Sequence, residues 1–550
     1  MKHLSTLFVL SLAAMFIALS ALSGLAQGRQ QPPPPKREFR GVWVATVNNL
    51  DYPRRPGTWA VAHREEWKQL LAQYKSMGFN AIIFQIRPAG DAFFASDLAP
   101  WSAFLTGQQG LGLDRDFDLL QFIIEETHRN GMEFHAWLNP YRATMNLDTA
   151  RLAASHVFNR HRNWVVQYGT RLYLDPGIPQ VREHIRDVVL EVVNQYPVDA
   201  IHFDDYFYPY PITNQEFPDS ISYLVYGQGM KDRNAWRRRN VDDLIEMLSV
   251  AIRETKPSVH FGISPFGVWR NERDDPAGSA TRAGAPTYDA LHADVLNWLR
   301  RGWIDYVAPQ LYWHIGFEPA DHAVLQRWWS QNSFGKHLYI GHAAYKVGND
   351  PQEQWSDPGE MPRQIRLARR NGRISGSIHF RSDHVLVGKL GLKDSLRHYY
   401  QTPALLPIRD EQELRVSNPP ELVRVRNKHG DARIVWRPAK TDRDRPPHYY
   451  VLYRFPTANP PLSASEDPRH ILHITPFGEQ PRRICFDDTR MERDQPYSYA
   501  VAAVNLAHEE SRLSELRTVA REGGRVKRYR APTPTASAGR KLSLFKGRGK

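Results

Sequence analysis

The segment DAIHFDDYFYP, residues 199–209, decides how the first two thirds of the chain are expected to fold. An apolar run that should form a buried strand ends in two adjacent acids, Asp204 and Asp205, and three aromatic residues follow at once. Burying a carboxylate is costly unless the group is solvated, paired or used in chemistry. This strand end is therefore the first candidate for a functional site.

Seven further runs of the same kind flank this segment, and stretches with helical periodicity separate them. They start at residues 39, 80, 132, 260, 305, 337 and 376 and read FRGVWVATV, NAIIFQIRP, MEFHAWLNP, HFGISPFGV, DYVAPQLYW, HLYIGHAAY and GSIHFRSDH. Eight strands that alternate with helices predict an α/β fold, a closed (β/α)8 TIM barrel over residues 38–405. A doubly wound open sheet is the competing architecture, but the even strand count and the absence of a glycine-rich phosphate turn favour the barrel.

Residues 415–520 show a different pattern of short strands with period two and no helical signal. This pattern predicts a small all-β immunoglobulin-like sandwich of the fibronectin type III kind. Trp436, Tyr497 and Tyr499 fall on strand positions, so we expect them in its core rather than on a sugar-binding face.

The two ends of the chain carry no expected fold. Residues 1–26 resemble a signal peptide, with an uncleaved anchor as the alternative, and residues 27–37 are a Pro-rich linker. The protein is thus expected to be exported to the periplasm, cell envelope or extracellular space. Residues 521–550 are expected to form a basic disordered tail, and the part from residue 525 supplies nine of the charges behind the net +13. Such a tail suits an anionic wall or membrane surface, or is simply solvated; no specific nucleic acid is expected.

Polar and aromatic side chains gather where the barrel strands end, which is the face that carries active sites in such barrels. Acids, amides, imidazoles and flat rings on one rim suit a carbohydrate groove. The strand after residue 132 also ends with Trp137 and Arg142 in this zone. The predicted substrate-binding residues are Arg87, Asn139, Tyr141, His202, Tyr206, Tyr208, Ser264, Gln310, Tyr312, Trp313, His342 and Arg381.

Hydrolysis of a glycoside needs a protonated acid and a second group that supplies or stabilises the nucleophile. Strand alternation sends the side chains of Asp204 and Asp205 to opposite sides, and Asp204 shares the parity of His202. Asp204 is the favoured acid, with Asp205 as the alternative, although both could merely cap the strand. For the second carboxylate we favour Asp91, which could equally be a helix cap. The remaining acids are Asp175 and Asp383.

Seven motifs occur in a fixed order along the barrel: EFRGVWVATV, QIRPAGDAFF, AWLNPYR, LDPG, DAIHFDDYFYP, GISPFG and APQLYW. By these motifs the segment from about residue 37 to 400 resembles the bacterial glycosyl-hydrolase-like 10 family. The resemblance implies a secreted or envelope (β/α)8 glycosidase that cleaves peptidoglycan glycan strands stripped of their peptides. The family usually has Gly where this chain has Ala200.

A weaker similarity links the same strand to family 18 chitinases, which use the N-acetyl group of the substrate as nucleophile. Tyr206 stands where their catalytic Glu would be, so their mechanism does not transfer directly. Substrate assistance with Asp204 or Asp205 as the acid stays open.

Two rival classes remain. His202, His342, His379 and Asp383 could be ligands of a metal-dependent barrel hydrolase, but no H-x-H follows the first strand, where such sites usually begin. The third class is a non-catalytic glycan-binding protein, which the paired acids argue against. We expect no metal and no other cofactor, and the sequence leaves the oligomeric state open.

Overall fold

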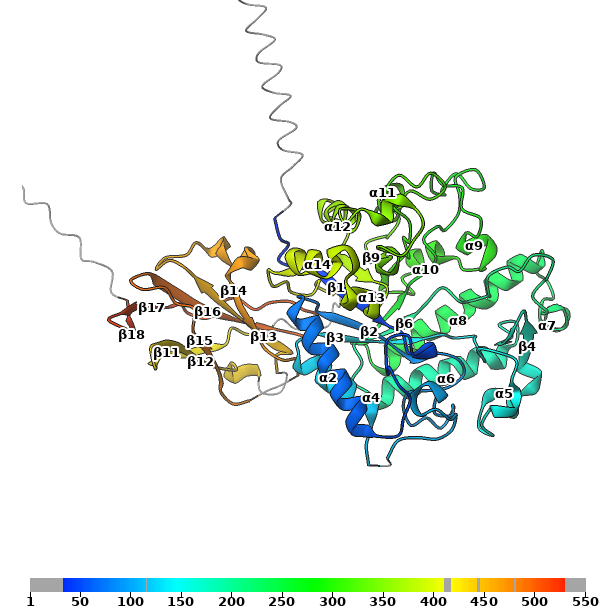
Figure 1. Ribbon diagram of the computed structural model, residues 1–550, viewed down its shortest axis with the longest axis horizontal. Helices are drawn as coiled ribbons and strands as arrows, with labels where there is room; N and C mark the ends of the chain where they lie inside the picture. Colours follow the sequence, from blue (N-terminus) through cyan, green and yellow to red (C-terminus); the bar gives the residue numbers. More distant parts are fainter. Residues whose placement is uncertain (1–32, 115, 410–416, 443–445, 479–480, 530–550) are drawn as a thin grey trace, which may run out of the picture. The chain divides into compact units, whose positions relative to one another are not determined.

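The computed structural model describes residues 33–114, 116–409, 417–442, 446–478 and 481–529 (Figure 1). The described chain forms two compact units. The first comprises residues 33–409 with the short segments 475–478 and 506–509, and the second holds the other described residues.

The first unit is a closed barrel of parallel strands, as the sequence predicts. Each of the eight predicted runs contributes one strand, and around the barrel the order is β1-β10-β9-β8-β7-β6-β3-β2. Their bounds are β1 (Phe39–Val44), β2 (Ala81–Arg87), β3 (Glu133–Leu138), β6 (Ala200–Phe203), β7 (His260–Ile263), β8 (Tyr306–Val307), β9 (His337–His342) and β10 (Gly376–His379). Strand β6 therefore ends one residue before the paired acids.

Helices follow the barrel strands and cover them with apolar faces. On α6, Val181, Ile185, Val188 and Val192 recur at helical spacing and are buried. Aspartate side chains cap α4, α8 and α11 at their first turns. The α-helices are α2 (Ala60–Ser76), α3 (Ala103–Thr106), α4 (Leu119–Arg129), α5 (Val157–Arg160), α6 (Pro179–Gln195), α7 (Ser220–Tyr226), α8 (Arg233–Thr255), α9 (Thr287–Ala290), α10 (Val295–Arg301), α11 (His322–Gln331), α12 (Glu360–Arg370), α13 (Ser382–Val387) and α14 (Leu392–Tyr400).

Short 3₁₀ turns complete the helical part of the described chain. Those in the first unit are η1 (Val47–Asn49), η2 (Thr149–Arg151), η3 (Arg162–Trp164), η4 (Ala344–Lys346), η5 (Glu353–Ser356) and η6 (Lys389–Gly391). Those in the second are η7 (Lys440–Asp442), η8 (Leu462–Glu466) and η9 (Pro468–His470).

Three details of the first unit differ from the sequence prediction. Strand β8 has only two residues, because Pro309 lacks the N–H that would continue the ladder. A hairpin that periodicity did not reveal, β4 (Val165–Tyr168) and β5 (Arg171–Leu174), is inserted between β3 and α6. The unit also extends past residue 405, since Arg409 forms an ion pair with the buried Glu133 at the start of β3.

The second unit contains two antiparallel sheets around a common apolar core. One sheet has the order β11-β12-β15 and the other β14-β13-β16-β17-β18. Trp436, Tyr497 and Tyr499 are buried in this core, as predicted. The bounds are β11 (Glu421–Lys428), β12 (Asp431–Arg437), β13 (Tyr449–Phe455), β14 (Ile471–Ile474), β15 (Ile484–Asp488), β16 (Pro496–Val504), β17 (Arg517–Glu522) and β18 (Arg525–Arg528).

The prediction that a disordered tail starts at residue 521 is wrong for its first residues. Strands β17 and β18 form a hairpin, and Gly523 and Gly524 at its turn have positive φ angles of 54° and 75°. The rest of that tail, residues 530–550, lies outside the described residues, as do the predicted signal peptide and linker residues 27–32. Within the described ranges, no helix is long and apolar enough to cross a membrane.

Candidate active site

Asp204 lies at the carboxyl end of β6 and points toward β3. Trp137 Nε1 donates to its Oδ2 over 3.0 Å, and Asn139 Nδ2 lies 3.2 Å from both carboxylate oxygens. The backbone N–H of Tyr206 adds a longer contact of 3.4 Å. The carboxylate is 4% exposed, so protein N–H groups replace water around it. These donors favour the ionised form.

Asp205 lies beside it but has different neighbours. The hydroxyl of Tyr210 donates to its carboxylate, and the Gln310 side chain also bonds to it. Gln310 follows β8 and is held by donating to the Ser264 carbonyl over 2.9 Å and to its hydroxyl over 3.2 Å. The two acids thus face different sectors of the rim, as strand alternation predicts.

The surroundings push the pKa values of the two acids apart. Burial raises the pKa of Asp204, while Arg142, Trp137 and Asn139 act in the opposite direction. Burial and the charge of Asp204 raise the pKa of Asp205 to about 6. Asp204 has more donors and a nearby guanidinium, so it loses its proton first, and its charge then favours a protonated Asp205. Two carboxyl groups with such different environments are the usual arrangement of an acid and its anionic partner.

A chain of aromatic rings lies along the rim next to Asp205. Tyr206 carries the Arg142 guanidinium over its face at 4.5 Å and meets Tyr210 at 5.9 Å between ring centroids. Phe266 continues the chain, 6.2 Å from Tyr210 and 5.2 Å from Trp313. Tyr312 belongs to a second group, 5.8 Å from Phe380 and 5.7 Å from Tyr345. Of the predicted binding residues, the structure therefore brings Asn139, Tyr206, Ser264, Gln310, Tyr312 and Trp313 to this region.

His202 is fully buried inside the barrel, two residues before Asp204. Trp43 Nε1 can only donate, so His202 Nε2 accepts over 3.2 Å and Nδ1–H must donate to the Tyr306 hydroxyl over 2.9 Å. That hydroxyl in turn donates to His135 Nδ1 over 2.9 Å, and His135 Nε2 donates to Glu133 over 3.0 Å. Burial holds the pKa of His202 well below its usual value. Both ring nitrogens of His202 are already occupied by protein groups.

Tyr208 and Tyr141 do not join the acids. Tyr208 is 1% exposed, packs on Phe217 and His292, and accepts a 3.4 Å hydrogen bond from Asn240 on α8. Tyr141 is also 1% exposed, and its hydroxyl has no hydrogen-bond partner among the described residues. Both rings fill space under the loops instead of lining the rim.

Arg87 and Asp91 form a separate buried group after β2. Asp91 accepts hydrogen bonds from the Ala89 backbone N–H over 3.1 Å and from Ser102, and burial raises its pKa to about 6. The Arg87 side chain is held beside it, and burial lowers its pKa to about 10. Asp91 thus shapes its own turn, where Gly90 has a φ of 63°.

Two residues of the metal-hydrolase alternative, His342 and His379, stack with 5.2 Å between ring centroids, but the four candidates do not form one cluster in the described chain. His342 bonds to Gln364 and Ser377, and His379 Nε2 lies 2.9 Å from the Tyr400 hydroxyl, whereas His202 belongs to the barrel floor. Arg381 pairs with Asp51 over 2.6 Å and lies near Asp383. Among the described residues, no cluster of three or more His, Cys, Asp or Glu side chains could hold a metal ion.

Sequence reasoning missed several residues of the site, chiefly Tyr210 and Phe266. A signal for Tyr210 was present, because tyrosines alternate at positions 206, 208 and 210. Phe266 lies in the motif GISPFG, which was noted without assigning that ring a role. The contact between them and the pair of acids depends on loops from different strands, which periodicity does not place.

The profile of the family described as Glycosyl hydrolase-like 10 matches residues 38–357, which include both acids. The chain belongs to this family. The chain is also similar to curated relatives: YngK of Bacillus subtilis strain 168 is 42% identical over 488 residues, 88% of this chain and 93% of that protein. DigH of Escherichia coli K12 is 38% identical over 370 residues, 63% of this chain and 83% of its own length. Both are named glycosyl hydrolases, and the enzyme class predicted from the sequence is confirmed.

Solved structures resemble the chain only distantly. The glycoside hydrolase domain of PgaB from Bordetella bronchiseptica is 14% identical, with a TM-score of 0.45. The match covers 66% of this chain and 99% of that domain. A likeness so distant supports no inference about the site.

Proposed function

We propose that this glycosyl hydrolase cleaves an N-acetylated polysaccharide of the bacterial cell wall, namely peptidoglycan glycan strands without peptides. The observation that carries the proposal is the adjacent pair Asp204 and Asp205, buried at the carboxyl end of a barrel strand in unlike environments. The family resemblance supplies the substrate class. The aromatic rings and amides around the pair provide the stacking surfaces and hydrogen bonds that a sugar chain needs.

Asp205 is the general acid in this proposal, in place of the Asp204 that the sequence favours. A group with a pKa of about 6 holds a proton for part of the time near neutral pH. Asp204 accepts N–H donors from Trp137 and Asn139, so it stays ionised and stabilises positive charge at the anomeric carbon. Asp91 has no part in the chemistry, because its carboxylate binds its own turn.

The reaction follows from these roles. The proton of Asp205 moves to the glycosidic oxygen as the bond from that oxygen to the anomeric carbon breaks, and the leaving sugar departs as an alcohol. The ionised Asp204 balances the charge that develops on the sugar. A water oxygen then bonds to the anomeric carbon, and the proton it releases restores the acid.

Product analysis tests the proposal. The protein is incubated separately with peptide-free peptidoglycan glycan, chitin oligosaccharides and a neutral β-glucan, and product masses are measured with the Asp205→Asn variant as control. We expect the first substrate to yield fragments heavier by one water per cut, and the variant to yield far fewer. Anhydro ends would show lytic cleavage, and turnover of the neutral glucan alone would show a different substrate class.

Two features of the whole chain belong to the same proposal. We infer that residues 1–26 direct export to the cell envelope. Fractionation of the native host tests this inference, and finding the protein only in the cytoplasmic extract would contradict it. We also infer that the antiparallel unit is of the fibronectin type III kind, because Trp436 and Tyr499 occupy its core. An experimental structure with a different strand order would contradict this assignment.

A further inference from the structure

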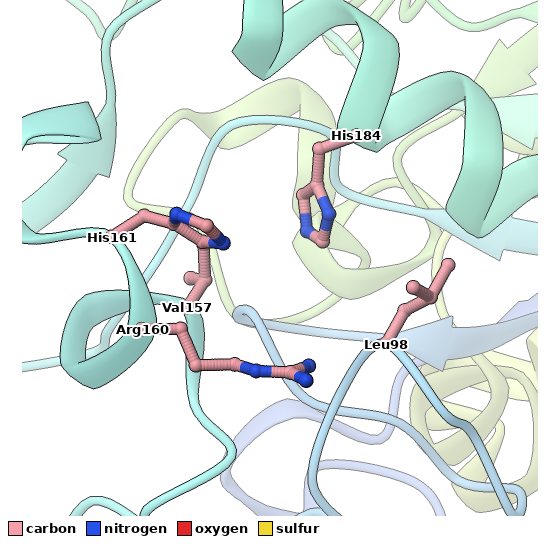
Figure 2. A pocket seen from close by; sticks show the side chains of 5 residues that line it. All are labelled: Leu98, Val157, Arg160, His161 and His184. Atoms are coloured by element: carbon pink, nitrogen blue, oxygen red, sulfur yellow. The ribbon is translucent and has the colours of Figure 1, made fainter.

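A pocket lined by none of the residues around the paired acids is rich in basic side chains. Its volume is about 470 Å³, within the range of small-ligand sites. Figure 2 shows the side chains around it, contributed by the loop after β2, by α5 and the residue after it, and by α6. They are Leu98, Val157, Arg160, His161 and His184.

The walls of this basic pocket are held in place. His161 stacks on Trp164 with 3.7 Å between ring centroids and an angle of 9°, and His184 contacts the same indole at 5.7 Å. The loop that carries Leu98 is tied to α6, since Glu191 accepts from the Ser96 hydroxyl over 2.6 Å and from the Asp97 N–H over 2.7 Å. A site whose rings and loop are fixed loses little entropy on binding.

Positive charge from arginine and unpartnered polar atoms make the basic pocket suitable for an anion. Three of its five lining side chains are bases and none is an acid, as far as the described residues show. His184 Nε2 is buried and has no hydrogen-bond partner in the described chain, and the same holds for Nη1 of Arg87. Arg87 is 2% exposed and adds positive potential at His184, although Asp91 and Glu191 offset part of it. Burial, together with Arg87 and Arg160, lowers the pKa of His184 to about 3, and burial and Arg160 also lower the pKa of His161. Near neutral pH the His184 imidazole is therefore uncharged and can offer an N–H hydrogen bond, while Arg160 supplies the positive charge.

The basic pocket belongs to the same end of the barrel as the acids. His156 precedes the first residue of α5, and its Nε2 bonds to the Ala143 carbonyl over 3.0 Å. Ala143 follows Arg142, which interacts with Asp204 and lies over Tyr206. The chain segment from the end of β3 through α5 therefore contributes both to the catalytic rim and to the basic pocket.

We propose that the basic pocket binds the carboxylate of an acidic sugar residue in the glycan. Arg160 is exposed and its side chain can pair with the carboxylate, since its guanidinium makes one hydrogen bond within the described chain, a long one of 3.4 Å to the Asp97 carbonyl. Nε2 of His184 supplies a second polar contact from the floor. The inference rests on the proposed function, because N-acetylmuramic acid carries a lactyl carboxylate that N-acetylglucosamine lacks.

A binding experiment with two sugars isolates the carboxylate. The full-length Asp205→Asn protein is titrated with N-acetylmuramic acid and with N-acetylglucosamine, alone and with Arg160→Gln or His184→Gln added. We expect the acidic sugar to bind more tightly, and each added change to remove roughly tenfold of that advantage. Arg373→Gln, an exposed arginine before β10, is the matched control and should change nothing. Equal affinity for the two sugars would overturn the proposal.

A kinetic comparison separates this inference from the proposed function. Arg160→Gln should raise KM for peptide-free peptidoglycan glycan several-fold and leave KM for chitin oligosaccharides and both kcat values unchanged. If the parent protein hydrolyses neither substrate, the proposed function fails while the sugar titration still decides on the pocket. If the parent protein hydrolyses both substrates and Arg160→Gln changes neither KM, the proposed role of the basic pocket is refuted while the proposed function stands. Inorganic phosphate is a further probe: a site that binds phosphate but not N-acetylmuramic acid would contradict the sugar assignment.

Discussion

Replacing Tyr210 by Phe should move the pH dependence of catalysis without destroying it. The Tyr210 hydroxyl donates to Asp205 and so favours the ionised form of that carboxyl. A hydrogen bond to a charged group contributes about 1.5–3 kcal/mol, and 1.36 kcal/mol corresponds to one pKa unit. Losing the bond should therefore raise the pKa of Asp205, about 6 in the parent, by about one unit or more.

The assay is the pH dependence of kcat/KM, which reports the pKa values of the free enzyme. The acid must be protonated, so activity falls as the pH rises through the pKa of Asp205. We expect this alkaline limb to lie about one pH unit higher in Tyr210→Phe, so that at pH 7 the protonated fraction rises from about a tenth to about a half. Tyr226→Phe on α7, where the ring is 44% exposed, is the control. An alkaline limb that stays in place or moves to lower pH would refute the reasoning.

Three further predictions concern the partner acid, the metal question and stability. Trp137→Phe removes the 3.0 Å donor to Asp204 and should lower kcat/KM about tenfold with little change in melting temperature; an unchanged rate would show that Asp204 does not act as an anion. Activity should persist in EDTA, because the acids bond to N–H and O–H donors, and the stacked rings of His342 and His379 bond to Gln364, Ser377 and Tyr400; loss with zinc rescue would favour a metal hydrolase. Arg409→Met leaves Glu133 buried without its cation and should cost about 3 kcal/mol in the free energy of unfolding, measured by urea denaturation. Burial alone would raise the pKa of Glu133, but Arg409, His135 and His508 hold it well below 4.5. The difference in unfolding free energy between the parent protein and Arg409→Met should therefore persist at neutral pH and shrink as the pH falls below 4.5. A free-energy difference that grows on acidification would contradict the assignment.

The barrel was predictable because each strand is buried on both faces and so appears in the sequence as a continuous apolar run. The runs from residues 39 and 199 became β1 and β6 with only their ends displaced. The hairpin of β4 and β5 was not predictable in this way, because Val165, Val166 and Gln167 are only partly buried or exposed and leave no such run. The β17–β18 hairpin was missed because its composition is basic, although the Gly-Gly turn at residues 523 and 524 was visible.

Alternation along β6 predicted that the side chains of Asp204 and Asp205 diverge and that Asp204 shares the parity of His202. It could not predict which acid keeps its proton, because that depends on Trp137, Asn139 and Tyr210, which reach the pair from other segments. His342 and Tyr208 illustrate the converse error. Both stand near strand ends in the sequence, yet the structure directs their side chains to Gln364 and to Phe217, away from the rim.

The acid role of Asp205 is tested most directly by comparing Asp204→Asn and Asp205→Asn on two substrates, the glycan and an aryl glycoside whose leaving group needs no proton. Removing a general acid commonly costs about 10²–10⁴-fold. We predict a loss of this order for Asp205→Asn on the glycan with most of the rate retained on the aryl glycoside, whereas Asp204→Asn should lose both. The opposite pattern would transfer the acid role to Asp204, and near-normal turnover of the glycan by both variants would contradict the placement of catalysis at this strand end.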